Sequence, residues 1–368
     1  MNDIVGAGGD WLSGPLSLGY SPVADVHDEL VSADGDVRPA WQDVSAFLAD
    51  LSPEEWSRRW QLGQQAMREQ GVTYNVYAGA DGDPAAWRLD PVPLVISGDE
   101  WAFLAAALTQ RATLLDLVLR DLLGHQTLLR DGHLPPALIA GHPGYFLPCV
   151  DPATAQRPHL QFYAADLARA PDGQWRVMMD RTEAPSGFGY ALANRRILSH
   201  VFPELLRSAG VHPVGRFFQD MRAGLAAIPK GANTDGRTVL LTPGHRNEAH
   251  FEHAFLARQL GCDLAEADDL TVRGGHVYLK TLEGLQPVDV ILRRTDTAWC
   301  DPLELRANST LGVPGLMAAA RQGKVSIVNP LRSGVVESPA LMPFLPGPSP
   351  PLPGQELTLA SAPPCWCA

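Results

Sequence analysis

Apolar residues recur three and four positions apart between residues 101 and 123. The residues with this spacing are Trp101, Leu104, Leu108, Leu115, Leu119 and Leu122. Such a period places them on one face of an α-helix. Ser97 and Glu100 match a capping box at the start of this helix, and Gly124 stands where a helix-ending glycine is expected. The pattern therefore predicts one long helix in this part of the chain.

Alternating character between Leu160 and Arg181 predicts a β-hairpin that turns at Pro171–Gly173. If the register centres on Asp172, Asp166 and Asp180 are diagonal neighbours on one face. Such neighbours lie about 7 to 8 Å apart, which a bound metal ion or a phosphate-bearing ligand could bridge. The alternative is that they are two solvated aspartates on the outer face of the hairpin.

The pattern changes to α/β at Arg237. It predicts a strand at Thr238–Leu241, a glycine-containing loop and a helix at Asn247–Leu260 that ends at Gly261. Further expected elements are a hairpin of Leu270–Val272 with Val277–Lys280, a strand at Val288–Arg293, a short helix at Val313–Arg321 and a strand at Lys324–Val328. This order predicts a parallel sheet whose ligand edge is formed by the carboxyl ends of its strands.

Four segments follow from these patterns. They are an N-terminal arm with helices near Trp41–Leu51 and Trp56–Met67 (1–70), a helical region with the hairpin (71–235), the α/β region (236–342) and a proline-rich tail (343–368). The length of 368 residues agrees with two or three domains, because single cores stop growing below that size.

Composition narrows the possible partners. A net charge of −12 argues against a nucleic-acid surface, since binding a phosphate backbone needs clustered cations. No apolar run approaches the roughly 20 residues that span a bilayer, and residues 1–20 lack the layout of a signal peptide. We therefore expect no membrane partner, a cytoplasmic location and reduced thiols at all five cysteines. The only lysines are Lys230, Lys280 and Lys324.

Four ordered motifs resemble the bacterial circularly permuted ATP-grasp type 2 family. They are Asp180–Arg195 with its Pro-Ser-Gly sequence, Leu241–His253, Val288–Arg306, and Leu311–Leu316 followed by Asn329 and Ser333–Pro339. The resemblance implies a mixed α/β chain with a partial ATP-grasp fold: an N-terminal helical region, a hairpin-containing antiparallel subdomain and a Rossmann-like pre-ATP-grasp domain. It also implies an ATP- and Mg²⁺-dependent carboxylate–amine ligase that makes peptide-like amides through an acyl phosphate.

The resemblance also implies roles for particular residues. It assigns catalytic roles to Ser186, Arg293 and Arg294, the two arginines forming an anion clamp. The metal ligands would be Asp166 and Asp180, although Met179 and Arg181 stand where relatives carry an acidic residue and an asparagine. Cofactor-binding roles fall to Gly187, Asn194, Arg195, Asn247, Glu248, Ser333 and Gly334. Arg332 stands where a glycine is common in the family.

Local structure offers another explanation for several of these residues. Ser186 and Gly187 could form a turn and a helix cap, and Asn247 and Glu248 are residues that a helix start selects. The arginine pair could form an ion-pair cluster with Asp296, Asp301 and Glu304. His250 and His253, three apart on a helix face, are expected to be surface or core side chains and not metal ligands.

Family members are expected to continue past a Cys-Trp-Cys-like stretch into strands whose lysines hold ATP. This sequence ends at Ala368, so the expectation is an incomplete ligase that acts on small-molecule or peptide carboxylates and amines. A partner segment or an intact paralogue would then bind ATP. Two alternatives stay open at this point: a non-catalytic nucleotide- or peptide-binding subunit, or a shared fold that serves other acyl or phosphate chemistry.

Overall fold

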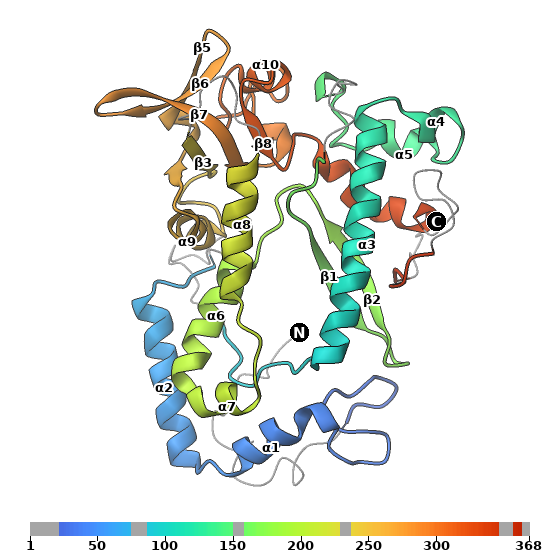
Figure 1. Cartoon of the computed structure of the whole chain (residues 1–368), viewed down its shortest axis with the longest axis vertical. Helices are drawn as coiled ribbons and strands as arrows, with labels where there is room; N and C mark the ends of the chain where they lie inside the picture. Colours follow the sequence, from blue (N-terminus) through green and yellow to red (C-terminus); the bar gives the residue numbers. More distant parts are fainter. Residues whose placement is uncertain (1–21, 75–86, 150–157, 229–236, 346–355, 363–368) are drawn as a thin grey trace. The chain divides into compact units, whose positions relative to one another are not determined.

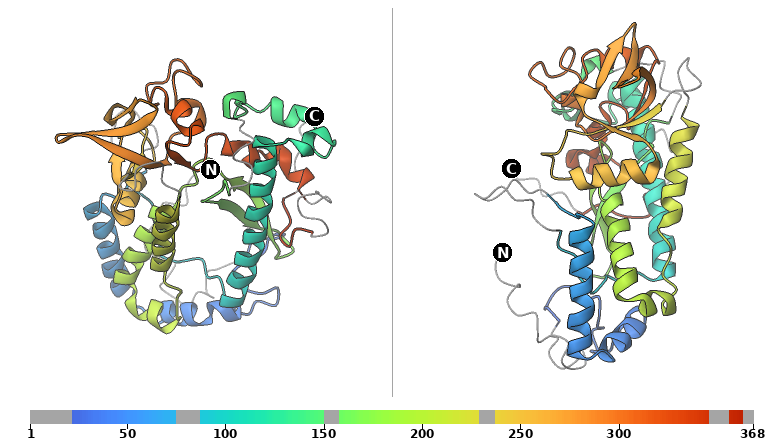
Figure 2. Two further views of the ribbon diagram at one scale, coloured as in Figure 1. Left: turned by 45° about the horizontal axis from the view of Figure 1, so that its top comes forward. Right: turned by 90° about the vertical axis from the view of Figure 1, so that its left-hand side faces the viewer.

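The computed structural model describes residues 22–74, 87–149, 158–228, 237–345 and 356–362 (Figures 1 and 2). Contacts between residues divide the chain into two compact units. Unit 1 consists of Met1–Ala102, Arg169–Gln174 and Tyr190–Arg216, and unit 2 of Phe103–Ala168, Trp175–Gly189 and Phe217–Ala368. The four segments expected from the sequence stay a prediction of domain boundaries. The chain is a mixed α/β protein, as expected.

Unit 1 is built from helices. They are α1 (Gln42–Ala49), α2 (Pro53–Glu69), α7 (Pro203–Ser208) and most of α6 (Phe188–Val201). Phe202, between α6 and α7, packs between Phe47 and Trp56, with ring centroids 5.9 and 5.5 Å away. Arg59 ties α2 to this pair through bonds to the Val201 carbonyl oxygen at 3.2 Å and to Glu204 at 2.9 Å. The two early helices expected from the sequence are confirmed.

Helix α3 (Gly98–Leu123) confirms the long helix predicted from the leucine spacing and starts three residues earlier. Leu115, Leu119 and Leu122 are fully buried, whereas Trp101 in the first turn is 52% exposed. Within the described residues, α3 is also the one helix long and apolar enough to cross a bilayer. Its buried leucines pack in the core of unit 2, which is the environment of a core helix.

The predicted hairpin is formed by β1 (Ala164–Arg169) and β2 (Trp175–Arg181), which lie along α3 in Figure 1. Residues 356–362 extend this ribbon. Val177 donates to the Ala360 carbonyl oxygen at 3.0 Å and accepts from the Ala362 N–H at 2.8 Å. Leu359 is buried, so this part of the proline-rich tail packs against unit 2 instead of forming a free linker.

A six-stranded sheet forms the centre of unit 2. Its strands are β3 (Arg237–Leu241), β4 (Asp263–Ala265), β5 (Leu270–Arg273), β6 (His276–Thr281), β7 (Gly284–Arg293) and β8 (Ser326–Val328). The order is β4-β3-β7-β6-β5, and β8 pairs with β7 as well. The pairs β3–β4, β3–β7 and β7–β8 are parallel, whereas β5–β6 and β6–β7 are antiparallel. The expected parallel sheet is therefore confirmed for the strands that carry the motifs.

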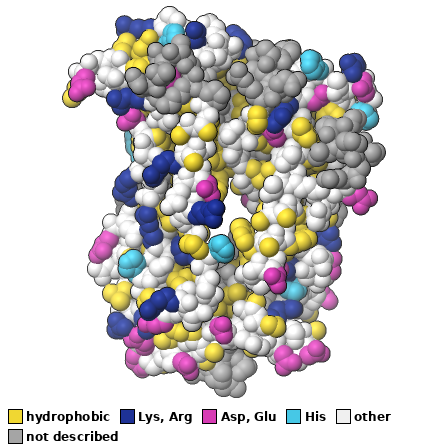
Figure 3. Space-filling view, viewed as in Figure 1, with side chains coloured by type: hydrophobic (Ala, Val, Ile, Leu, Met, Phe, Trp, Pro, Cys, Tyr) yellow, Lys and Arg dark blue, Asp and Glu magenta, His cyan; other side chains and the backbone are white. Residues whose placement is uncertain are grey.

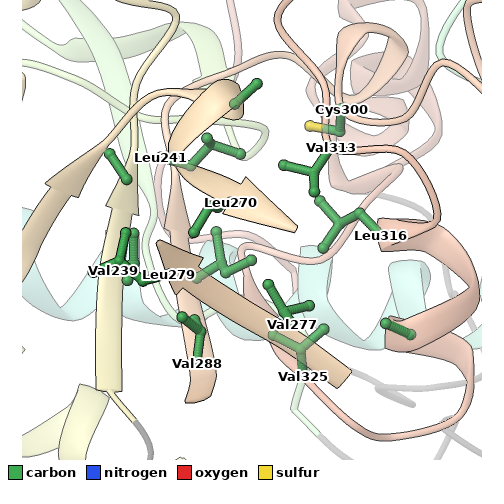
Figure 4. Close-up of a cluster of buried hydrophobic side chains, with 14 of the residues drawn as sticks. Val239, Leu241, Leu270, Val277, Leu279, Val288, Cys300, Val313, Leu316 and Val325 are labelled. Atoms are coloured by element: carbon green, nitrogen blue, oxygen red, sulfur yellow. The ribbon is translucent and has the colours of Figure 1, made fainter. Parts of the chain in front are cut away.

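Both faces of the sheet centre are buried. Val239, Leu241 and Ile291 join a cluster with residues of α10 (Leu316–Arg321), part of which Figure 4 shows. Leu240 and Leu292 alternate with them and are equally buried, and α9 (His250–Leu260) packs against β3 and β4. Fully buried strands of this kind are typical of sheets covered by helices on both sides.

The remaining elements are short, apart from α8 (Gly215–Ala227). They are α4 (Thr127–Arg130), α5 (Pro136–Ala140) and the 3₁₀ turns Pro39–Trp41, Leu147–Cys149, Ala267–Asp269, Thr297–Trp299, Ser333–Glu337 and Pro339–Phe344. Several further boundaries differ from the sequence expectation. Helix α9 begins at His250 because residues 247–249 form a turn, and α10 begins only at Leu316. Strand β7 begins at Gly284 because its first half pairs with β6. Strand β4 was not expected.

Candidate functional site

The carboxyl ends of three parallel strands meet at one edge of the sheet in unit 2. Leu241 of β3 pairs with Arg293 of β7, and Leu292 of β7 pairs with Val328 of β8. The segments that follow these strands therefore start side by side, where α/β sheets bind ligands. The segment 182–189, which contains the Pro-Ser-Gly motif, is hydrogen-bonded to residues that follow each strand. The four motifs thus converge on this edge.

Arg293 holds the edge together and is 1% exposed. Its Nε donates to the Asn329 carbonyl oxygen at 2.8 Å, and Nη1 donates to that of Thr295 at 3.0 Å. Nη2 donates to Pro330 O at 3.1 Å and to Ser333 Oγ at 3.0 Å. These acceptors belong to the protein, so in this conformation Arg293 does not offer an open clamp to an anion. Its role in ligand binding stays a prediction.

The ion-pair cluster of the two arginines with Asp296, Asp301 and Glu304, which was the alternative to an anion clamp, does not form. Asp301 instead accepts hydrogen bonds from backbone N–H groups of Leu303 and Met317, and Glu304 pairs with Arg321. The carboxylate that approaches Arg293 is Glu183, at 3.5 Å. Glu183 Oε1 also accepts from the Thr297 N–H at 2.7 Å. Burial alone would raise the pKa of Glu183, but the Arg293 charge and this hydrogen bond lower it overall.

Asn329 has a structural role that the sequence did not indicate. Its Oδ1 accepts from the N–H groups of Gln161 and Phe162 at 2.9 and 3.0 Å. Its Nδ2 donates to the carbonyl oxygens of Phe162 and Thr182, both at 2.7 Å. The amide thus links the turn after β8 to both sides of the β1–β2 hairpin. Only its place in a family motif could have drawn attention to it.

Arg294 and Glu252 contact the Pro-Ser-Gly segment from two elements. Arg294 follows β7, is 6% exposed and donates through Nη1 to the Pro185 carbonyl oxygen. Glu252 of α9 is fully buried, and its Oε1 accepts from the N–H groups of Gly187 at 2.7 Å and Gly189 at 2.8 Å. Burial raises the pKa of Glu252, although Arg294 and the two N–H groups act against the rise. The sequence analysis did not single out Glu252.

A pocket of about 350 Å³ opens beside this network in unit 2. It is lined by His142, Pro143, Gly144, Phe146, Met179, Glu183, Asp296, Ala298, Trp299, Gly334, Glu337, Ser338 and Pro339. Three of these residues are carboxylates, and within the described chain none of the lining residues is lysine or arginine. Burial lowers the pKa of His142, so this imidazole is neutral near pH 7. The lining therefore favours a cationic ligand.

The three carboxylates of this acidic pocket differ in their partners. Glu337 Oε2 accepts from the N–H groups of Thr182 at 2.7 Å and Glu183 at 3.0 Å, which fixes it in place. Glu183 is held by Thr297. Asp296 is exposed to solvent, yet the protein atoms around it displace part of its water, and this desolvation together with the nearby Glu183 charge raises its pKa. Asp296 is thus the pocket carboxylate best suited to take up a proton.

The two predicted metal ligands are separately paired with arginines. Asp180 is buried, and Arg111 grips it through Nε and Nη2, both at 2.7 Å, while the Tyr163 hydroxyl donates to it at 2.7 Å. Asp166 is exposed and pairs with Arg181 at 2.8 Å. Within the described residues, no group of three or more His, Cys, Asp or Glu side chains could hold a metal ion. These side chains therefore do not fit Mg²⁺.

Two other predicted residues belong to unit 1, whereas the edge belongs to unit 2. Asn194 and Arg195 lie on the part of α6 that belongs to unit 1. Asn194 Oδ1 accepts from Trp87 Nε1 at 2.9 Å, and Arg195 donates to the His212 carbonyl oxygen at 2.9 Å. Both side chains thus have structural partners within unit 1, and their cofactor-binding roles stay predictions.

The other predicted residues lie at the edge itself. Ser186 and Gly187 are exposed, and Gly187 adopts a φ of 106°. Ser333 is buried against Arg293. A Cβ at Gly334 would lie 2.7 Å from Glu183 Oε2, so a glycine is required for the backbone to approach this carboxylate. Asn247 accepts from the Ala249 N–H at 3.0 Å in the turn before α9. The N-cap of α9 is Ala249 and has no side-chain cap, so neither Asn247 nor the half-buried Glu248 caps this helix.

His253 is a core side chain, as expected. It is 3% exposed, and its Nδ1 lies 2.9 Å from Thr242 Oγ1.

Arg332 is also fully buried and lies 3.5 Å above the Tyr145 ring, at a φ of 78°. Such a backbone conformation is the one that glycine adopts readily, in agreement with the glycine common at this position in relatives. Lys230, Cys365 and Cys367 lie outside the described residues.

Residues 93–368 match the model of the circularly permuted ATP-grasp type 2 family. The chain belongs to this family. It is 40% identical over 348 residues to the uncharacterized protein Rv2567 of Mycobacterium tuberculosis; the match covers 92% of this chain and 39% of that relative. The uncharacterized protein sll0335 of Synechocystis is 34% identical over 327 residues, covering 89% of this chain and 68% of the relative. The chain thus spans well under half the length of the mycobacterial protein.

Among solved structures, the chain is similar to a glutathione synthetase-like effector of Globodera pallida in its apo form. The TM-score is 0.48 at 13% sequence identity, and the match covers 81% of this chain and 67% of that one.

Proposed function

We propose that this chain forms the amine-binding part of an ATP-dependent carboxylate–amine ligase. The observation that supports this most is the acidic pocket at the edge where the family motifs converge. Glu183, Asp296 and Glu337 supply three carboxylates to the lining, and Arg293, 3.5 Å behind Glu183, offsets one of these charges and leaves the pocket negative. Such a lining attracts an ammonium group and repels phosphate. The ligand that we assign to it is the amine of a small molecule or peptide.

The chemistry requires the amine to lose a proton. An ammonium ion has no free electron pair, so a base must accept its proton before the nitrogen attacks an acyl carbon. We assign this role to Asp296, since its raised pKa favours proton uptake. The C–N bond then forms as the activating phosphate leaves with the electron pair of the broken acyl bond, and the departing phosphate takes up the second proton that the nitrogen loses. Glu183 and Glu337, held by backbone N–H groups, would orient the amine.

The cofactors that the family implies are ATP and Mg²⁺. The described residues fit neither. Asp166 and Asp180, the predicted metal ligands, are paired with arginines, and the guanidinium of Arg293 donates its hydrogen bonds to protein oxygens. The pocket itself is acidic. Phosphate binding would therefore come from a partner segment or paralogue.

We also propose a cytoplasmic setting without nucleic-acid partners. In agreement, basic and acidic side chains are interspersed over the face shown in Figure 3.

Binding of a simple amine tests the proposal. Glycinamide, which has an amine and no carboxylate, should bind to the wild-type protein, and N-acetylglycinamide should not. Asp296→Asn should weaken glycinamide binding about tenfold, as expected for the loss of one charged contact. Asp268→Asn removes the same charge from the exposed Asp268 outside the pocket and should leave binding unchanged. Equal binding of both probes, or no effect of Asp296→Asn, would refute the amine site.

A non-catalytic peptide-binding subunit is the second candidate, favoured by the arginine-paired aspartates. Acetyl phosphate separates the two, because it supplies an activated acyl group without ATP. If the pocket activates amines, acetyl phosphate and glycinamide should give N-acetylglycinamide and phosphate faster with wild type than with Asp296→Asn. Tight glycinamide binding without any such acceleration would instead support the binding subunit.

A further inference from the structure

Arg294 has an unused pair of hydrogen-bond donors in the interior of unit 2. Its Nη1 donates to Pro185, but among the described residues its Nε and Nη2 have no hydrogen-bond partner. The whole side chain is 6% exposed. Leaving buried donors unsatisfied costs on the order of 1–3 kcal/mol, more for a charged group. This edge of the guanidinium therefore calls for an acceptor that the described residues do not supply.

The unused edge is the one with which other arginines of this protein grip carboxylates. Arg111 donates from Nε and Nη2 to the two oxygens of Asp180, each at 2.7 Å. Arg58 donates from the same two atoms to the oxygens of Glu55, at 2.9 and 2.8 Å. Two parallel N–H groups in one plane match the two oxygens of a carboxylate. The vacant edge of Arg294 thus has the geometry of a carboxylate fork.

Glu252 presents the complementary vacancy. Its Oε1 is occupied by two backbone N–H groups, whereas Oε2 is buried and has no hydrogen-bond partner among the described residues. The two groups are electrostatically coupled, yet they share no hydrogen bond. A ligand between them must accept from Arg294 and donate to Glu252. The segment 185–189 contacts both groups, and its Ser186 and Gly187 are exposed to solvent.

We propose that Arg294 and Glu252 form a subsite for the α-amino acid group, with the carboxylate on the Arg294 fork and the ammonium on Glu252 Oε2. The opposite charges of the ligand match those of the two side chains in order, so no net charge is buried. A free phosphate would satisfy the fork but would place acceptor oxygens against Glu252. This subsite is separate from the acidic pocket, whose lining includes neither residue. Its test therefore stands or fails independently of the proposed amine site.

Four small probes test the subsite: glycine, acetate, methylammonium and inorganic phosphate. The readout is the ¹⁵Nε resonance of Arg294, assigned by its loss in Arg294→Lys. Glycine and acetate should both shift this resonance saturably. The Kd of glycine should be lower than that of acetate by about tenfold or more, because the glycine ammonium adds one charged contact with Glu252. In Arg294→Lys, calorimetry should show affinities for glycine and for acetate that are lower by about tenfold or more, because lysine keeps the charge but lacks the two parallel N–H groups.

Glu252→Gln separates the two halves of the subsite and serves if Arg294→Lys does not fold. It should remove the preference for glycine over acetate, since only glycine carries the ammonium, and should leave acetate binding at least as tight as in wild type, because the removed carboxylate no longer repels an anion. Unfolding midpoints of both variants show whether the fold is retained. Three results would overturn the proposal: glycine binding no better than acetate, phosphate binding better than acetate, or no saturable shift by any probe. The last would indicate a hydrated structural pair.

Discussion

Arg111, Arg293 and Arg294 are all buried, and each has a different set of partners. Arg111 is paired with a carboxylate and Arg293 with carbonyl and hydroxyl oxygens, whereas Arg294 has one carbonyl acceptor and lies over the Phe188 ring. A buried charge is tolerated only when its surroundings compensate it. In this conformation the first two side chains are engaged by protein oxygens, and we therefore propose the third as the ligand-binding arginine.

The buried pair of Arg111 and Asp180 should be important for stability. Asp180→Asn removes the charge that compensates a fully buried guanidinium, and we expect a loss of about 3–5 kcal/mol of unfolding free energy. Asp166→Asn makes the same change in the exposed pair with Arg181 and should cost less than about 1 kcal/mol. Urea denaturation of both variants measures the difference. Similar losses would contradict the assignment of Asp180 as a structural residue.

His253 should make the fold sensitive to acid. Burial, with smaller effects from Arg294 and His250, lowers its pKa from 6.5 to about 3 in the folded state. Between these values the unfolded chain binds the extra proton, so stability falls as the pH decreases through this window. One proton corresponds to about 1.4 kcal/mol per pH unit. Denaturation at several pH values should show a slope smaller by this amount in His253→Gln. The same substitution at the exposed His200 is the control, and an equal change there would contradict the prediction.

At the residue scale, the sequence motifs named some residues of the edge but not what each side chain does, and Asn194 and Arg195 belong to unit 1. Ser186, Gly187, Arg293, Arg294 and Gly334 do lie together. The pairing of Asp180 with Arg111 could not be predicted, because the residues are 69 positions apart and spacing carries no information on such contacts. For the same reason Glu252, Asn329 and the acidic pocket had no recognisable local pattern.

Helices and strands were easier to predict, because each shows its period within a few turns. The α3 spacing and the β3 and β5–β6 patterns gave the correct element types. Errors fell where tertiary pairing decides: β4 has three residues and is defined by its partner β3, and the start of β7 is defined by β6. The turn at residues 247–249 replaces a helical turn that the pattern alone could not exclude.

Two helix glycines should respond in opposite directions to alanine. Gly261 ends α9 at a φ of 71°, so Gly261→Ala should destabilise by about 1 kcal/mol. Gly224 lies within α8, where a Cβ would meet nothing within 4 Å, so Gly224→Ala should stabilise by about 0.5–1 kcal/mol. Thermal unfolding of the two variants checks this. Shifts of the same sign would contradict either the left-handed conformation of Gly261 at the end of α9 or the helical environment of Gly224 within α8.

For the molecule as a whole, the family was recognisable from the sequence because four motifs occur in a fixed order. The structure explains their number: the turns after β3, β7 and β8 and the Pro-Ser-Gly segment hydrogen-bond to one another at a single edge. The edge is a fixed scaffold that displays carboxylates to solvent, not the open arginine clamp that the sequence suggested. We therefore propose that this chain binds the amine and that a partner segment or paralogue binds phosphate.

Calorimetric titration of the purified chain with glycinamide and, separately, with Mg·ATP tests this assignment most directly. The account predicts saturable heat from glycinamide, because the acidic pocket attracts a cation, and none from Mg·ATP, because the same carboxylates repel phosphate. Saturable binding of Mg·ATP together with no binding of glycinamide would contradict it.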